Sequence, residues 1–245
     1  MSKRLLTVLG GARPPYIRTL QKLFGTSIVS YLPLDETSGT DALDSSGNGY
    51  NGVYTNGVTL APATFDGTDD YIKWYTAEFR TAFVENEGAF IIWVKIPADV
   101  WAEAANRYII RFYSGDGDLI YLSKVNVVNG LQFKYTAGGT AKTITNYDKG
   151  GNLNWMMLAL SWSKTNDQLI AYADGYQLGT TQTSLGTWTG SALPASSGMN
   201  IGAYLTSNLS YNFKGSLAHA TYLSRAITPA EALKVYRANP TMAAA

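Results

Sequence analysis

Residues 155–179 read WMMLALSWSKTNDQLIAYADGYQLG, and this stretch decides the fold class. Its two apolar runs, 155–161 and 169–173, have the length of buried β-strands. Asp174 and Gly175 follow the second run. Such a pair favours a two-residue type I′ hairpin, because both central residues of that turn need positive φ angles. The stretch therefore predicts consecutive antiparallel strands.

The same pattern extends along the chain in both directions from this stretch. Apolar or alternating runs recur at the spacing of roughly 8–12 residues that sandwiches and barrels show. Turn clusters separate them, including Asn56-Gly57, Asn129-Gly130 and Gly138-Gly139. The predicted strands are 27–34, 51–55, 71–75, 89–96, 108–113, 119–122, 131–135, 155–161, 169–173, 200–204 and 216–223. We expect an all-β fold, a two-sheet antiparallel jelly-roll sandwich.

Composition excludes several classes of function. The 245 residues include no cysteine and one histidine, so thiol catalysis, zinc-thiolate sites and disulfide scaffolds are excluded. The 19 basic and 18 acidic residues give a formal charge of +1, so the chain as a whole carries no signature of nucleic-acid binding. Apolar runs fall well short of the ~18 residues of a membrane span, and we expect no membrane association.

The basic charge is concentrated at the N-terminus. Residues 1–25 hold five basic side chains and no acidic one. Apolar residues there have the spacing of a short amphipathic helix, opened by Pro14-Pro15 and ended by Gly25. This arm either packs on its own domain or docks on a partner. The candidate partner-binding residues are Arg13, Tyr16, Arg18, Leu20, Lys22, Leu23 and Phe24.

We expect three segments: a basic arm over 1–25, a sandwich over 26–238 and a tail over 239–245. Near the end of the sandwich, Thr228-Pro229-Ala230-Glu231 predicts the start of a second short helix. Thr228 can cap it, Pro229 suits its first turn, and Glu231 can bond back to the Thr228 amide. Asn239-Pro240 should end this helix.

Several strings, in the correct order over about residues 26–238, resemble laminin-G-like jelly rolls of the concanavalin A-like lectin/glucanase superfamily. They are YLPLDETSGT (31–40), DSSGNG (44–49), FDGTDDYI (65–72), AFIIWVK (89–95), YADGYQLG (172–179), FKGSL (213–217) and LSRAITPAE (223–231). The resemblance implies the sandwich fold. The closing strand departs from the family by carrying Ala218 and His219 where an acidic pair is usual.

The segment before the sandwich also resembles a known type. A tyrosine-led helix followed by IVSYLPLDETSGT (28–40) is similar to the start of laminin-G-like proteins encoded by tailed bacteriophages. That resemblance implies a structural protein of the virion, a capsid decoration or tail component assembled in the host cytoplasm. Its partners would be other virion proteins, with homo-oligomers expected.

The sequence does not predict an enzyme. Glucanases of this fold carry E-x-D-x-x-E along one strand, so that alternate carboxylates enter one cleft. No glutamate here begins that pattern; Glu85 and Glu87 have the spacing but lie in a predicted loop. We interpret His219, in a predicted strand, as a hydrogen-bonded structural residue. A glycan-cleaving enzyme is the least favoured of three hypotheses.

Calcium is the one cofactor that the residues suggest. Hard cations take six to eight oxygen ligands from carboxylates, amides and turn carbonyls. The candidate ligands, in two glycine-containing loops, are Asp44, Asn48, Asp66, Asp69 and Asp70. The alternative is that these residues cap tight turns.

Glycan binding is the second functional hypothesis. Sugar-binding faces combine exposed aromatic rings with polar groups, and Trp74, Trp101 and Trp188 lie in or near predicted edges or loops. Exposed aromatics also mark protein interfaces. We therefore expect a non-enzymatic virion protein that acts through its arm and sandwich surface. The alternative is a lectin-like carbohydrate-binding module that recognises cell-surface glycans and depends on calcium.

Overall fold

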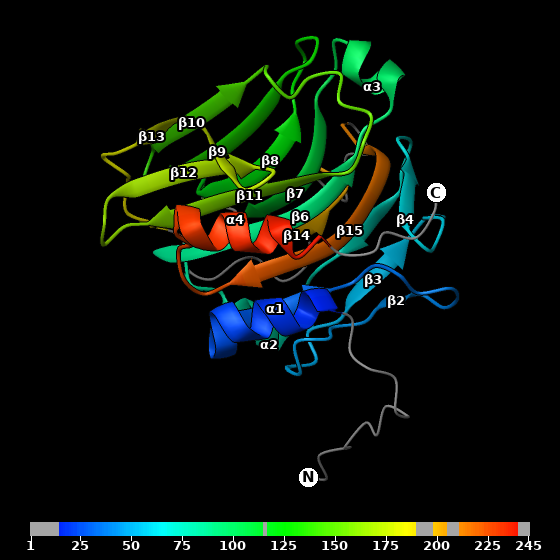
Figure 1. The fold of residues 1–245 in the computed structure, drawn as a ribbon, viewed down its shortest axis with the longest axis horizontal. Coiled ribbons are helices and arrows are strands. Elements are labelled where there is room, and N and C mark those ends of the chain that lie inside the picture. The colour runs from blue at the N-terminus through cyan, green and yellow to red at the C-terminus, as the bar shows by residue number, and fades with distance from the viewer. Residues whose placement is uncertain (1–14, 115–116, 190–197, 205–210, 240–245) are drawn as a thin grey trace, which may run out of the picture.

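The computed structural model describes residues 15–114, 117–189, 198–204 and 211–239 (Figure 1). Two antiparallel sheets pack face to face, with a short helix near each end of the chain. The predicted jelly-roll sandwich is therefore confirmed. None of the described helices is long and apolar enough to cross a membrane.

Each sheet is built from strands that are distant in sequence. The seven-stranded sheet has the order β1 (Ile28–Leu32), β15 (Lys214–Leu223), β6 (Glu87–Lys95), β11 (Met156–Ser163), β12 (Gln168–Ala173) and β13 (Tyr176–Gln182), with β4 (Ala63–Asp66) also paired to β15. The eight-stranded sheet has the order β10 (Thr140–Asn146), β9 (Leu131–Ala137), β8 (Leu119–Lys124), β7 (Arg107–Tyr113), β14 (Met199–Ile201), β5 (Tyr71–Lys73), β3 (Gly52–Thr55) and β2 (Asp41–Ala42). The helices are α1 (Pro15–Phe24), α2 (Ala77–Ala82), α3 (Ala98–Ala102) and α4 (Pro229–Arg237), and a 3₁₀ turn, η1, covers Gly25–Ser27.

The hairpin predicted at Asp174-Gly175 joins β12 to β13. The φ angles of these two residues are +51° and +82°, and Ala173 pairs with Tyr176 across the turn. A second tight hairpin joins β9 to β10 through Gly138 and Gly139, whose φ angles are +54° and +74°. Positive φ at both central positions is what a type I′ turn requires.

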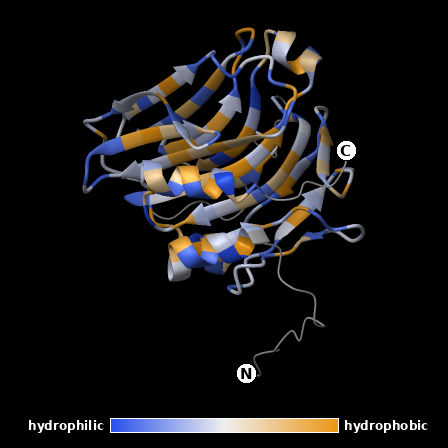
Figure 2. Ribbon diagram, viewed as in Figure 1, coloured by the Kyte–Doolittle hydropathy of each residue, from blue (hydrophilic) through white to orange (hydrophobic). Residues whose placement is uncertain are grey.

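The seven-stranded sheet is apolar on both faces. In β6, Phe90, Ile92 and Val94 enter the core between the sheets, whereas Ile91 and Trp93 face the opposite way. That outer face packs against α1 and α4, which lie side by side over it (Figure 1). The continuous apolar run of this strand therefore follows from burial on two sides, and apolar residues line both sheets (Figure 2).

The predicted amphipathic helix is α1, and it packs on its own sandwich. Tyr16, Leu20 and Phe24 are buried against the seven-stranded sheet and α4. The indole Nε1 of Trp93 donates a hydrogen bond to Tyr16 Oη (3.1 Å), and the Arg225 guanidinium lies 5.0 Å from the centre of the Phe24 ring. Of the two alternatives for the arm, packing on its own domain therefore applies to helix α1.

The buried side chains of α1 are consequently not free to bind another protein. Arg18 and Lys22 are exposed, and Leu23 is half-buried. Arg13 lies outside the described residues. Docking of the arm on a partner stays a prediction, and in the described part of α1 it would depend on Arg18 and Lys22.

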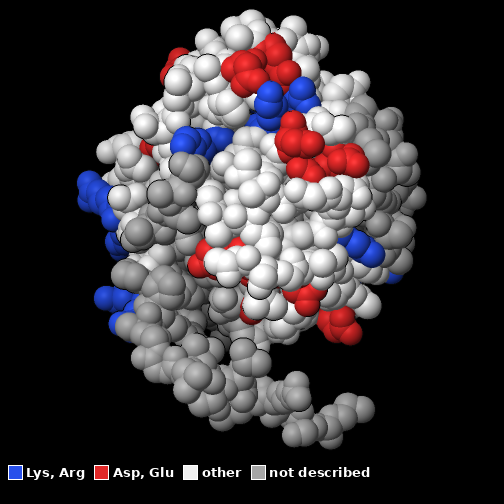
Figure 3. Space-filling model, turned by 90° about the vertical axis from the view of Figure 1, so that its right-hand side faces the viewer, with Lys and Arg blue, Asp and Glu red and all other residues white. Residues whose placement is uncertain are grey.

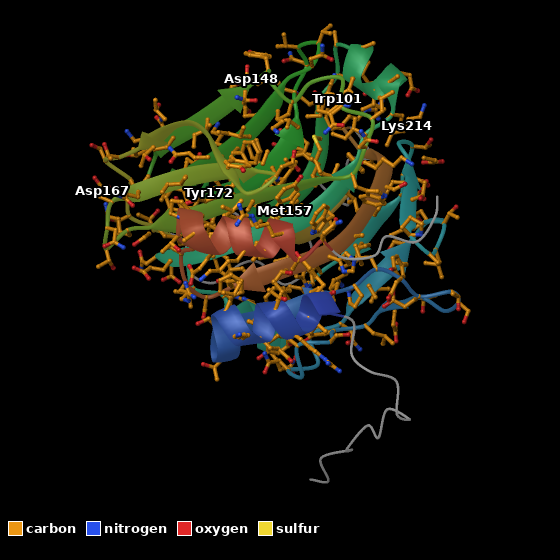
Figure 4. The ribbon with its side chains drawn as sticks, in the orientation of Figure 1. Trp101, Asp148, Met157, Asp167, Tyr172 and Lys214 are labelled. Carbon is orange, nitrogen blue, oxygen red and sulfur yellow. The ribbon has the colours of Figure 1, made fainter. Side chains whose placement is uncertain are left out.

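Helix α4 begins with the predicted capping box. Thr228 Oγ1 accepts a hydrogen bond from the Glu231 amide (3.2 Å), and a Glu231 carboxylate oxygen accepts one from the Thr228 amide (2.8 Å). This exchange satisfies two amides that would otherwise lack partners at the helix start. The helix covers the outer sheet face beside Met157 and Tyr172 (Figure 4).

His219 lies beneath α1, at a bulge in β15. Its φ angle is +54°, and its Nδ1 and Tyr31 Oη share a hydrogen bond of 2.7 Å. The ring stacks on Tyr31 and contacts Tyr16 at 5.0 Å between ring centres. Burial lowers the pKa of His219 to about 4, because the charged imidazolium loses its hydration. The histidine is thus a hydrogen-bonded part of the packing, as the sequence predicted.

We predict that acid destabilises the protein through this histidine. The unfolded chain takes up the proton below a pH of about 6.5, whereas the folded chain does so only near 4, so the free energy of unfolding falls as the pH falls between these values. Burial raises the pKa of Tyr16 and Tyr31, so both remain neutral throughout this range. From pH 7 to pH 5 the expected loss is about 1–2 kcal/mol in urea unfolding. His219→Asn, which tolerates the positive φ, should lose less over the same range. Equal pH dependence of the two proteins would contradict the prediction.

Candidate binding surface

A row of polar side chains crosses the outer face of the eight-stranded sheet. The strand register places Lys73, Asn200, Arg111, Tyr121 and Lys134 directly opposite one another on five neighbouring strands. Their neighbours along each strand belong to the core between the sheets, so the row faces outward. At the usual strand spacing, the row spans about 19 Å.

Arg111 occupies the centre of this row. It is 1% exposed, and its guanidinium carbon lies 4.5 Å from the ring centre of Tyr113 and 4.3 Å from that of Tyr204. Nη1 donates a hydrogen bond to the Tyr204 carbonyl oxygen (2.7 Å), and Nε is buried without an acceptor. Burial lowers the pKa of this guanidinium. Two aromatic rings therefore hold the charge in place of a carboxylate.

Tyrosines surround the arginine. The ring centres of Tyr108 lie 5.0 Å from Tyr121 and 4.8 Å from Tyr204, and Tyr204 lies 5.9 Å from Tyr211. Burial raises the pKa of Tyr108 and Tyr121, so these phenols are neutral and can both donate and accept hydrogen bonds. We call the following set the tyrosine face: Tyr108, Arg111, Tyr113, Tyr121, Tyr204 and Tyr211.

The strands that carry this face have a strong bias of charge. Strands β3, β5, β7–β10 and β14 contain six basic residues and no acidic one. Two of the six are already engaged at one end of the sheet, because Arg107 pairs with Glu103 (2.6 Å) and Lys124 donates to the Glu103 carbonyl oxygen. The face of the molecule in Figure 3 differs, because acidic and basic side chains lie next to each other there.

The chemistry of the tyrosine face is that of binding. Flat phenol rings can cover the apolar side of a sugar ring, and neutral hydroxyls and the Gln132 amide can bond its hydroxyl groups. Tyr121 Oη already donates to Gln132 Oε1 (2.5 Å). Glu87, considered above as half of a catalytic pair, lies in β6 rather than in a loop and accepts a hydrogen bond from Ser163 Oγ (2.9 Å).

The expectation that three tryptophans are exposed was wrong. Trp74, Trp101 and Trp188 are 0%, 2% and 9% exposed and belong to the core between the sheets, so none presents a ring face to a ligand. Trp74 Nε1 donates to Ser30 Oγ (3.0 Å), and Trp101 Nε1 donates to the Asn152 carbonyl oxygen (2.9 Å) at the α3 end of the molecule (Figure 4).

Two of the candidate calcium ligands, Asp44 and Asn48, already form hydrogen bonds with the backbone. Asp44 accepts hydrogen bonds from the backbone amides of Tyr31 and Tyr50, both 2.9 Å. The Asn48 side-chain amide donates to the carbonyl oxygens of Ile28 and Val29. These contacts tie the loop to β1, as the turn-capping alternative predicts.

The structure does bring Asp66, Asp69 and Asp70 together. One carboxylate oxygen from each lies within 4.8 Å of the others. Asp66 and Asp70 also accept backbone hydrogen bonds, from Thr68 (2.7 Å) and from Asp66 (2.9 Å). Burial raises the pKa of Asp70, with its acidic neighbours contributing. The three clustered oxygens, one from each carboxylate, are fewer than the six to eight that calcium takes, so calcium binding stays a prediction.

None of the six side chains of the tyrosine face is among the site residues predicted from the sequence. A signal exists in residues 107–113, where Arg111 and Tyr113 alternate with the buried Ile110 and Phe112. Such alternation indicates a strand with one polar face. The alternation does not indicate which other strands lie beside this one. The tyrosine face forms only because particular strands are neighbours in the sheet.

Comparison with known proteins gives a likeness of fold. No family model matches this sequence, and no curated protein matches it. Among solved structures, the binding domain of botulinum neurotoxin serotype D superposes with a TM-score of 0.64 at 14% identity, over 89% of this chain and 53% of that one. The ligand binding domain of the same serotype in complex with N-acetylneuraminic acid gives 0.65 at 14% identity, over 89% and 52%.

A third solved structure is Trypanosoma rangeli sialidase in complex with sialic acid. It gives a TM-score of 0.64 at 15% identity, over 86% of this chain and 33% of that one. This chain thus spans about half the length of the neurotoxin domains and a third of the sialidase. At such low identity the likeness shows the jelly-roll fold alone.

We predict that Arg111 does not contribute to stability. Replacing it by methionine removes a buried charge that no carboxylate among the described residues pairs with, and this relieves a desolvation cost. Urea unfolding of Arg111→Met should give a free energy of unfolding within about 1 kcal/mol of the wild type, or above it. The neighbouring core change Ile110→Ala should lose about 2–5 kcal/mol in the same assay. A comparable loss for Arg111→Met would show that the arginine is structural.

Proposed function

We propose that this protein is a non-enzymatic, glycan-binding module and that the tyrosine face is its binding surface. The observation that carries the proposal is Arg111 held between Tyr113 and Tyr204 on the outer side of a sheet. The other outer sheet face is closed by α1 and α4. Aromatic rings beside neutral hydroxyls and amides are the combination that sugar recognition needs.

The solved neighbours support this proposal. Two of them are binding domains, and the structures of one neurotoxin domain and of the sialidase hold N-acetylneuraminic acid or sialic acid. They share with this chain a fold rather than a sequence. A binding role on this fold therefore agrees with the chemistry of the tyrosine face. Such a role does not need the pair of carboxylates that a glycosidase uses.

The second candidate function is structural adhesion within a phage virion, as a capsid decoration or tail component. The resemblance of 28–40 to phage laminin-G-like proteins favours it. A further observation is that α1 is anchored by Tyr16 and exposes Arg18 and Lys22, so the basic segment before it starts from a fixed point. The two functions are compatible, because a virion protein can bind cell-surface glycans. Other virion proteins and copies of this chain would be its partners.

Glycan binding should depend on two tyrosines of the tyrosine face, the half-buried Tyr204 and the exposed Tyr211. On a glycan array, Tyr204→Ala and Tyr211→Ala should each weaken binding about fivefold or more, since an aromatic contact is worth about 1 kcal/mol or more. Tyr176→Ala is the matched control, because Tyr176 is exposed on β13 of the other sheet. The same array with a calcium chelator tests dependence on the ion. Equal loss in all three variants, or no glycan bound by the wild type, would contradict the proposal.

Virion placement should depend on the segment before α1. Removing residues 1–14 leaves Tyr16 and Leu20 in place, so the sandwich should keep its stability. In an infected culture we expect the full chain to co-purify with particles and the truncated chain to lose most of its occupancy. Unchanged occupancy would exclude the arm as the anchor, and a full chain absent from particles would exclude the virion role.

A further inference from the structure

We propose that the tyrosine face selects glycans that carry an anionic group, either a carboxylate or a sulfate. Arg111, together with Lys73 and Lys134, would supply the opposite charge. This inference rests on the proposed function and specifies its ligand class.

The first argument is the missing counter-ion of Arg111. Arg107 and Arg225 each pair with a glutamate at 2.6 Å, and their side chains are 18% and 33% exposed. Arg111 is almost wholly buried, yet it forms no ion pair with a described carboxylate. Of these three arginines, the most buried one is therefore the one that lacks a carboxylate partner. A bound anion would complete it with a charge-assisted hydrogen bond.

The second argument is the pair of lysines in the same row. Lys73 and Lys134 lie two strands away from Arg111 on either side, at about 10 Å. Lys73 Nζ lies 5.7 Å from the Tyr75 ring centre, and Lys134 Nζ lies 5.9 Å from that of Tyr121. Aromatic surfaces thus keep both ammonium groups near the face, where three positive charges act on one ligand.

The third argument is the absence of opposing charge. None of the seven strands from β3 to β10 across the sheet contains an aspartate or glutamate, and burial keeps Tyr108 and Tyr121 neutral by raising the pKa of each. A neutral sugar gains stacking and neutral hydrogen bonds here. An anionic sugar gains in addition charge-assisted bonds, which are roughly twice as strong.

Matched glycans test this selectivity on the full-length protein. Calorimetric titration would compare a carboxylate-bearing oligosaccharide with its methyl ester, and a sulfated oligosaccharide with its unsulfated form, at low and high salt. We expect the anionic member of at least one pair to bind about tenfold more tightly, with the advantage reduced at high salt. The two pairs distinguish carboxylate from sulfate recognition.

Two negative results have different meanings. Equal affinity for the neutral and anionic members of both pairs would overturn this inference and leave glycan binding standing. No affinity for any glycan would overturn the proposed function, and this inference with it.

Variants of Arg111, Lys73 and Lys134 test whether these side chains cause the preference for anionic glycans. Arg111→Gln should reduce affinity for the anionic glycan about tenfold and leave that for its neutral form within about twofold. Lys73→Gln and Lys134→Gln should each flatten the salt dependence. Lys142→Gln is the control, because Lys142 pairs with the core residue Tyr135 and so projects from the other face of the same sheet. If Arg111→Gln fails to fold, the two lysine variants carry the test. A preference for anions unchanged in every variant that folds would overturn the proposal.

Discussion

The arrangement of this protein depends on a sheet that is apolar on both sides. The central strands β15, β6 and β11 bury one row of side chains between the two sheets and the opposite row beneath α1 and α4. Uncovering the second row would expose Ile91, Trp93 and Met157 to water, and each large apolar side chain contributes about 1.5–3 kcal/mol when buried. Helices α1 and α4 must therefore stay packed on the outer face of the seven-stranded sheet. Polar and aromatic groups collect instead on the outer face of the eight-stranded sheet, where the proposed binding surface lies.

The apolar outer face of the sheet also makes the N-terminal helix α1 a part of the folded domain. Tyr16 accepts a hydrogen bond from Trp93 and contacts His219, which in turn bonds to Tyr31. These four side chains link α1 to three strands of the sheet. A helix held in this way is part of the fold, and it can serve as a fixed base for the basic residues that precede it.

Arg111, at the centre of the proposed binding surface, is not a residue that stability alone would select. A guanidinium buried between Tyr113 and Tyr204 gains cation–π contacts but loses hydration without gaining a carboxylate. Residues that are costly in the free fold are often those that a ligand completes, because binding supplies the missing partner. The carboxylates of Asp66, Asp69 and Asp70 form the opposite case, since backbone amides already use two of them.

The sequence by itself determined the class of fold and its local signals. Alternating apolar runs, the Asp174-Gly175 turn and the Thr228 capping box all act between near neighbours, so their outcome follows from residue order. Only the tertiary structure decided which aromatic residues face water. Trp74 and Trp101 belong to the core between the sheets, whereas Lys73, Arg111 and Asn200 meet because β5, β7 and β14 are neighbours in the sheet. Pairing between distant strands depends on the packing of the whole molecule, and for that reason no local pattern could place them together.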